Sequence, residues 1–163
     1  MKVMRVYPAK PADVYLYATC LVDLFDPVAG LDAIALLERE GIRVHFVEKQ
    51  TCCGQPAYTS GHEEEARKVA QSQMALFPEP WPVVVPSGSC AGMLVHHWPR
   101  LFADDPALRA KAERLQALVQ NRAFNPPADL LKDAPDIVAQ ERSLYESRRA
   151  ELSAQISITQ SQL

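Results

Sequence analysis

Several features are scarce in this chain of 163 residues, and each scarcity excludes a class of protein. No apolar run approaches the ~18 residues of a membrane-spanning helix, so we expect no membrane span. Basic residues are not in excess, because the formal net charge is −3, so we expect no nucleic-acid partner. Residues 1–10 carry charges but no apolar stretch typical of a secretory signal. We therefore expect a cytoplasmic protein.

The bulk composition is that of an ordinary globular protein. Hydrophobic residues make up 48% of the chain and charged residues 23%. A chain of this length can form one domain with its own core and a smaller appendage.

Cysteine is the informative residue type. The chain has Cys20, the adjacent pair Cys52 and Cys53, and Cys90. The cytoplasm keeps thiols reduced, so cysteines there indicate metal or redox chemistry more than disulfides. A lone cysteine is often a small buried apolar residue, but an adjacent pair followed by Gly54 is not typical of that role.

Short β-branched runs alternate with amphipathic stretches along residues 12–120. Asp26 before Pro27 marks a helix start, with Leu31, Ile34, Ala35 and Leu37 as its expected apolar face and Gly41 as its stop. Ser60 and Glu63 form a capping-box pattern at a second helix, which Pro78 ends. We predict strands at 14–17, 43–47 and 83–85, loops at 48–59 and 86–90, and helices at 26–41, 60–77, 91–102 and 105–120.

This order of elements predicts an α/β fold, a three-layer sandwich around a small parallel sheet. In such sheets ligands bind outside the carboxyl ends of the strands. All four cysteines follow predicted strands. We therefore expect them to meet at one edge of the sheet.

The character of the chain changes near residue 121. Residues 125–127 (NPP) form a break, and residues 135–163 show no strand signal. Val138, Tyr145, Leu152 and Thr159 recur every seven residues, which predicts a long C-terminal helix. Such a helix could bind a coiled-coil partner or pack on its own domain. We predict two units, residues 1–120 and 121–163.

A cluster of thiolates is what soft metal centres need, above all iron–sulfur clusters. Gly54 lets the backbone turn so that both adjacent cysteines can face inward. Gly88, flanked by Ser87 and Ser89, lets the chain pass close to a cluster, and Ser89 could donate a hydrogen bond to a cluster sulfur.

Three segments around these cysteines resemble a known family. They are residues 17–23 (YATCLVD), 51–56 (TCCGQP) and 85–93 (VPSGSCAGM). Together they are similar to the cysteine-rich CCG domain of the family that includes heterodisulfide reductase and lactate utilization protein A, and the resemblance covers about residues 12–118. It implies an iron–sulfur electron-transfer component, an oxidoreductase subunit of a complex that oxidises L-lactate to pyruvate, with other iron–sulfur subunits as partners.

The resemblance also implies roles for individual residues. The implied metal ligands are Cys20, Cys52, Cys53 and Cys90. The implied residues around the cofactor are Tyr17, Thr19, Gly54, Gln55, Pro56, Ser87 and Ser89.

The chain departs from the family pattern in two respects. The broader motif ends in Cys-x-x-Cys, and its last position here is Met93. Family members usually carry two such domains, whereas this chain has one cysteine set. Residues 124–149 resemble the helical hairpin of type I secretion membrane-fusion proteins, which suggests a tail of separate origin.

Other interpretations of the thiols stay open. Four thiolates also suit structural zinc, which would be redox-silent. The domain could have lost its metal and act as an interaction module with its helical tail. Cys52 and Cys53 could form a strained, labile disulfide. His96 and His97 could contribute a zinc ligand, although adjacent helical positions point about 100° apart and disfavour both doing so.

Overall fold

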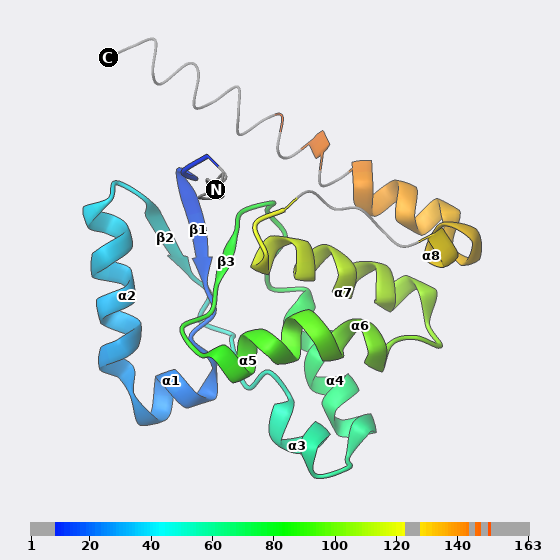
Figure 1. Ribbon diagram of the computed structural model, residues 1–163, viewed down its shortest axis with the longest axis horizontal. Helices are drawn as coiled ribbons and strands as arrows, with labels where there is room; N and C mark the ends of the chain where they lie inside the picture. The colour runs from blue at the N-terminus through cyan, green and yellow to red at the C-terminus, as the bar shows by residue number, and fades with distance from the viewer. Residues whose placement is uncertain (1–8, 123–127, 144–145, 148–149, 151–163) are drawn as a thin grey trace, which may run out of the picture.

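A computed structural model describes residues 9–122, 128–143, 146–147 and 150. Its centre is a parallel sheet of three strands in the order β2-β1-β3. Strand β1 (Asp13–Leu16) pairs along its whole length with β2 (Arg43–Phe46), and its end pairs with β3 (Val83–Val84). Helices cover both faces of the sheet, as Figure 1 shows, so the predicted three-layer α/β fold is confirmed.

The two faces carry different helices. On one side lie α1 (Thr19–Phe25) and α2 (Pro27–Arg39). On the other side lie α4 (Glu63–Met74) and α7 (Pro106–Val119) (Figure 1). Shorter elements complete the second side: α3 (Gln55–Thr59), α5 (Gly88–Gly92), a π-helical turn η1 (Met93–His97) and α6 (Trp98–Leu101).

The main core lies between the sheet and the α4–α7 side. Successive residues of a strand point to opposite faces, so Tyr15 and Tyr17 face this core together. Their rings lie 5.3 and 5.4 Å from the ring of Phe77. Trp98 and Phe102 are also fully buried here. Aromatic burial of this kind is the largest apolar contribution that a small domain can make.

Both predicted Asp-Pro helix starts are confirmed. The carboxylate of Asp26 accepts a hydrogen bond from the Ala29 N–H at 3.3 Å, at the start of α2. Asp105 accepts one from the Leu108 N–H at 3.0 Å, at the start of α7. Gly41 ends the first helix region in the left-handed conformation, with φ of +73°.

The predicted capping box at Ser60 and Glu63 is wrong. Ser60 instead ends α3, and Gly61 turns the chain with φ of +81°. Helix α4 therefore begins at Glu63, and no side chain caps it. The predicted loop at 48–59 contains α3, because Pro56 is preorganised for the first turn of a helix.

Three further expectations need correction. Helix α1 was not predicted, and it follows β1 directly. Cys90 lies on α5 rather than in a loop. The helix begins at Gly88, and because glycine disfavours helices, this start was not predicted from the sequence. Leu31 and Ala35 of the expected apolar face of α2 are exposed.

The described part of the C-terminal region is helical. Helix α8 (Ala128–Asp133) precedes helical residues 135–143. Leu130 and Val138 are buried against Ala110 of α7, and the Arg114 Nε lies 3.3 Å from a carboxylate oxygen of Glu141. The other heptad positions, Tyr145, Leu152 and Thr159, lie outside the described residues.

No helix within the part of the chain that the structure describes is long and apolar enough to cross a bilayer.

Candidate functional site: four thiols at the carboxyl edge of the sheet

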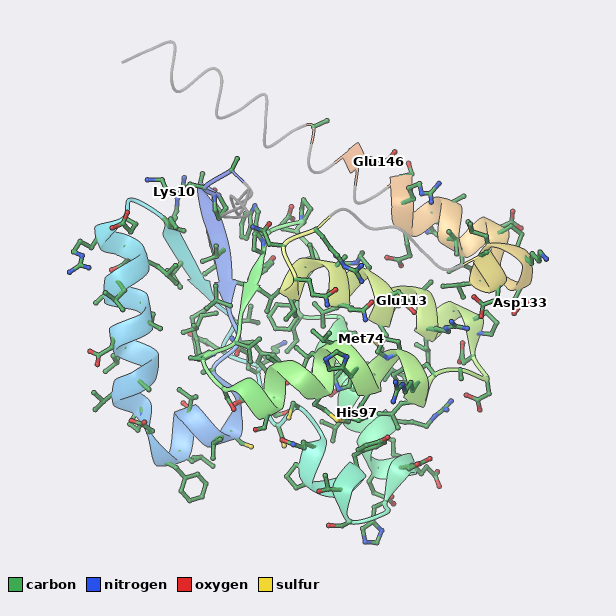
Figure 2. The ribbon with its side chains drawn as sticks, in the orientation of Figure 1. Lys10, Met74, His97, Glu113, Asp133 and Glu146 are labelled. Carbon is green, nitrogen blue, oxygen red and sulfur yellow. The ribbon has the colours of Figure 1, made fainter. Side chains whose placement is uncertain are left out.

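The four cysteines stand where the three strands end. Cys20 lies in α1, directly after β1, and Cys90 lies in α5, directly after β3. Cys52 and Cys53 lie between β2 and α3. Figure 2 shows yellow sulfur atoms at this lower end of the sheet, whereas Lys10 marks the opposite end.

The buried hydroxyl of Tyr17 is the common neighbour of the four thiols. Tyr17 is fully buried, and its hydroxyl donates a hydrogen bond to the Cys52 carbonyl oxygen at 3.1 Å. Burial raises the pKa of Tyr17, and the charges of all four cysteine thiolates raise it further. The Tyr17 hydroxyl therefore lies within electrostatic reach of all four thiols.

The thiols approach one another in two pairs, and all four are free of disulfides. The thiol of Cys20 pairs with that of Cys52, and desolvation together with this pairing raises the pKa of Cys20 to about 11. The thiol of Cys53 pairs with that of Cys90, and desolvation raises the pKa of Cys53. The adjacent cysteines Cys52 and Cys53 therefore interact with different partners, one on α1 and one on α5.

Cys90 is the exception among the thiols. Its burial opposes ionisation, but the polar side chains of Ser87, Thr19, Cys53 and Ser89 beside it together lower the pKa of Cys90. The hydroxyls of Ser87 and Ser89 also lie 3.4 Å apart. Two residues expected near the cofactor thus lie at this thiol, at the start of α5.

Thr19 holds an unusual backbone conformation beside Cys20. Its φ is +62°, which is rare for a β-branched residue and costs roughly 1–3 kcal/mol. Its side chain is buried, and its Oγ1 makes no hydrogen bond of ordinary geometry within the described structure. The hydroxyl nevertheless acts on the Cys90 thiol. A strained, buried and polar residue of this kind is typical of a binding site.

Gly54 forms the turn that the adjacent cysteines need. Its φ of +83° is left-handed, and its N–H donates to the Sγ of Cys52 at 3.4 Å. A Cβ here would stand 3.3 Å from the Ala66 carbonyl oxygen of α4. Gln55 and Pro56 follow in the first turn of α3, and the Gln55 backbone lowers the pKa of Cys53 against the larger effect of burial.

Three residues that hold the cysteine loops were not predicted as site residues. The Gln73 Oε1 accepts from the Thr51 N–H at 2.8 Å and lies 3.5 Å from the Tyr17 hydroxyl. The Trp98 Nε1 donates to the Cys53 carbonyl oxygen at 2.9 Å. Gln73 could have been noticed, because it is a polar residue on the buried face of α4.

Gln50, the third of them, joins the loop after β2 to the end of β1. Its Nε2 donates to the Leu16 carbonyl oxygen at 2.7 Å, and its Oε1 accepts from the Ala18 N–H at 3.0 Å. This amide therefore fixes the spacing between the segment that carries Cys20 and the segment that carries Cys52.

Met93, His96 and His97 do not join the thiols as hydrogen-bonding partners. Met93 is fully buried in the main core. His96 is exposed, and the ring of His97 packs 4.6 Å from the ring of Tyr58. Burial and contacts with other thiols and hydroxyls, rather than a histidine, are the main causes of the pKa shifts of Cys20, Cys53 and Cys90.

The side chains as they lie do not yet form a metal-binding set. No group of three or more His, Cys, Asp or Glu within residues 9–122 and the described part of the tail is gathered closely enough to hold an ion. The donor set nevertheless fits a soft metal, because four thiols that follow the ends of three strands stand at one edge of the sheet.

The fold and this thiol edge define a class of protein. The family model for the cysteine-rich domain named CCG matches residues 14–95, so the chain belongs to that family. The match contains all four cysteines and most of the three-stranded sheet.

Particular relatives extend this result. The chain is similar to lactate utilization protein A of Geobacillus kaustophilus, at 49% identity over 104 residues, which are 64% of this chain and 43% of the relative. It is similar to the protein of that name from Shouchella clausii, at 48% identity over 103 residues, which are 63% of this chain and 43% of the relative. No solved structure matches the chain.

The chain spans less than half the length of the relatives it matches. The comparisons give no support to the resemblance between the tail and membrane-fusion proteins.

Proposed function

We propose that this chain is an iron–sulfur electron-transfer component of lactate utilization. Cys20, Cys52, Cys53 and Cys90 would bind the cluster through their thiolates. The proposal extends to the setting: the cytoplasm, a complex that oxidises L-lactate to pyruvate, and other iron–sulfur subunits as electron partners. The names of the relatives support the connection with lactate.

One observation carries the proposal. Four cysteines follow the ends of all three strands and so stand at the carboxyl edge of a parallel sheet, next to the buried Tyr17. That edge is where such sheets bind their ligands. Soft thiolates bind iron–sulfur clusters, which accept and release single electrons.

The surrounding residues would each have a defined task. Thr19, Ser87 and Ser89, which lower the pKa of the Cys90 thiol, would donate hydrogen bonds to sulfur. Such bonds stabilise the charge on sulfur and tune the reduction potential. Gly54 would keep the adjacent cysteines turned inward, and Tyr17 would hold the Cys52 backbone. The burial of Cys53 and Cys90 would keep water away from that side of the cluster.

The organisation of the chain is part of the proposal. Residues 1–120 would form the cluster-binding domain, and residues 121–163 would form the helical addition. The burial of Val138 favours packing of the first part of this addition on α7.

Anaerobic purification tests the proposed cofactor. We expect iron and sulfide in the protein, a visible absorption band, and reversible reduction of that band by dithionite. Two single substitutions, Cys53→Ser and Cys20→Ser, should each abolish the binding of iron and sulfide. Far-ultraviolet circular dichroism should show that both variants are still folded. Met93→Leu is the matched control, because Met93 is buried in the core and supplies no thiolate.

The outcomes separate the alternatives. Zinc without iron would replace the proposal with a structural zinc site. Absence of any metal after reconstitution with iron and sulfide would overturn both and leave the interaction module. A disulfide between Cys52 and Cys53 in the purified protein, detected by mass spectrometry, would support direct thiol chemistry instead.

A further inference from the structure

The α1–α2 side of the domain exposes an unusual amount of apolar surface. Within the described residues, eight large apolar side chains are exposed, and seven of them lie on α1, α2 or β2. Leu24 and Phe25 at the end of α1 are 70% and 79% exposed. The seven are Leu21, Leu24, Phe25, Val28, Leu31, Leu36 and Phe46, and we call them the α1–α2 face.

This face has a shape as well as an apolar character. A hollow of about 260 Å³ opens between β1, α1, α2 and the end of β2. Its lining includes Leu16, Val22 and Ile34 at the bottom and Leu31 and Phe46 at the rim. The exposed side chains together offer several hundred Å² of apolar surface, a size that marks an interaction site on a soluble protein.

The charge around the α1–α2 face is mainly negative. Residues 19–39 contain Asp23, Asp26, Asp32 and Glu38, all exposed, against a single basic residue, Arg39 at the end of α2. The basic residues on and after β2 are Lys49 and Arg43, and Arg43 pairs with Asp13 at 3.2 Å. A second copy of the chain would bring two acidic rims together, and like charges opposed across an interface disfavour it.

The α1–α2 face adjoins the thiol site. Helix α1 carries both Leu21 and Cys20, so the apolar surface begins beside one of the four thiols. Cys20 and Cys52 are the half-buried thiols, whereas Cys53 and Cys90 are buried. An electron partner would therefore approach the cluster most closely on the side of Cys20 and Cys52, and the α1–α2 face adjoins Cys20.

We propose that the α1–α2 face docks a partner protein through a helix whose apolar stripe is flanked by lysine or arginine. The stripe would fill the hollow and cover Phe25, and its basic flanks would pair with the acidic rim. The role of this docking in electron transfer rests on the proposed function. The binding chemistry itself does not.

Two synthetic helical peptides test the inference on the full chain. Both carry the same leucine and phenylalanine stripe, but one is flanked by lysines and the other by glutamates. We expect the lysine peptide to bind at least about tenfold more tightly by isothermal titration calorimetry, with the difference shrinking at high salt.

Phe25→Asp separates docking from general charge attraction. It makes the protein more negative, so unspecific attraction would strengthen binding of the lysine peptide. Docking predicts the opposite, a loss of about tenfold or more, because the substitution replaces the most exposed apolar side chain of the face by a carboxylate. Leu131→Asp is the control, since Leu131 is 41% exposed on α8, away from this face, and its substitution should not weaken binding.

Three results would overturn the inference. The two peptides could bind equally well, the lysine peptide could fail to bind, or Phe25→Asp could leave the affinity for the lysine peptide unchanged. Self-association of the chain that Phe25→Asp abolishes, measured by analytical ultracentrifugation, would assign the face to a second copy instead. Iron and sulfide are assayed on the same samples. If the peptide binds but no cluster is found, only the proposed function is overturned. If a cluster is found but the peptide does not bind, only the docking is overturned.

Discussion

The two helical layers of this domain differ in what they cover. The α4–α7 layer buries Tyr15, Tyr17 and Phe77 and supplies the hydrogen bonds from Gln73 and Trp98 to the cysteine loops. The α1–α2 layer covers the opposite face of the sheet and carries Cys20, but most of its large apolar side chains are exposed. The α4–α7 layer therefore makes the larger core and supports the cysteine loops, whereas the α1–α2 layer also offers a surface. Paired substitutions in the two layers test this division.

Replacing a phenylalanine by alanine should give the largest difference in unfolding free energy between the two layers. Phe77→Ala removes a fully buried ring and should cost roughly 3–5 kcal/mol of unfolding free energy. Phe25→Ala removes an exposed ring and should change it by less than about 0.5 kcal/mol. Urea denaturation measures both. If Phe77→Ala fails to fold, Phe77→Leu should fold at a cost of about 1.5 kcal/mol. Equal costs in the two layers would contradict the division.

Two glycines offer a matched pair. Gly41 and Gly54 both have positive φ, but only at Gly54 would a Cβ meet a neighbour, the Ala66 backbone of α4. Gly41→Ala should cost about 1 kcal/mol from the backbone alone. Gly54→Ala should cost about 3 kcal/mol, because the contact adds to the backbone strain. We also expect Gly54→Ala alone to lower iron content. A similar iron content in both variants would show that the turn is not needed for the site.

The buried amide of Gln73 is the next test. Gln73→Leu keeps the volume but leaves the Thr51 N–H without its acceptor, which should cost about 2 kcal/mol. Gln71→Leu is the control on the exposed face of the same helix and should be nearly neutral. Hydrogen exchange at the Thr51 amide gives the direct measurement. Unchanged protection in Gln73→Leu would remove this residue from the support of the cysteine loop.

The two Asp-Pro helix caps should give the smallest difference. Asp105→Ala removes a 3.0 Å hydrogen bond at the start of α7 and should cost about 1 kcal/mol in global unfolding. Asp26→Ala removes a longer, exposed bond at the start of α2. It should fray that helix, seen by hydrogen exchange, at under about 0.5 kcal/mol of global stability. A larger global cost at Asp26 would show that the α1–α2 layer is needed to hold the fold.

Local chemistry made much of this fold predictable. Asp26 and Asp105 cap their helices through neighbours three residues away, so the signal is complete within a few residues. All strands of a parallel sheet end at the same edge, so the predicted order of strands was enough to place the cysteines together there. These inferences need no knowledge of distant contacts.

The remaining features depend on distant contacts. Helix α5 begins at Gly88 against local propensity, and Ser60 lost its predicted capping role to the turn at Gly61. The support by Gln73 and Trp98 joins residues 22 and 45 positions apart in the chain. A sequence pattern cannot show such pairs before the fold brings them together.

The indole of Trp98 gives the protein an optical reporter of its own. The chain has two tryptophans, and Trp98 is hydrogen-bonded to the backbone of Cys53, whereas Trp81 stacks on His45. In a Trp81→Phe background, all tryptophan emission would come from beside the thiols. A visible-absorbing chromophore assembled there would quench that emission by energy transfer. Assembly could then be timed in a stopped-flow fluorimeter, without a label.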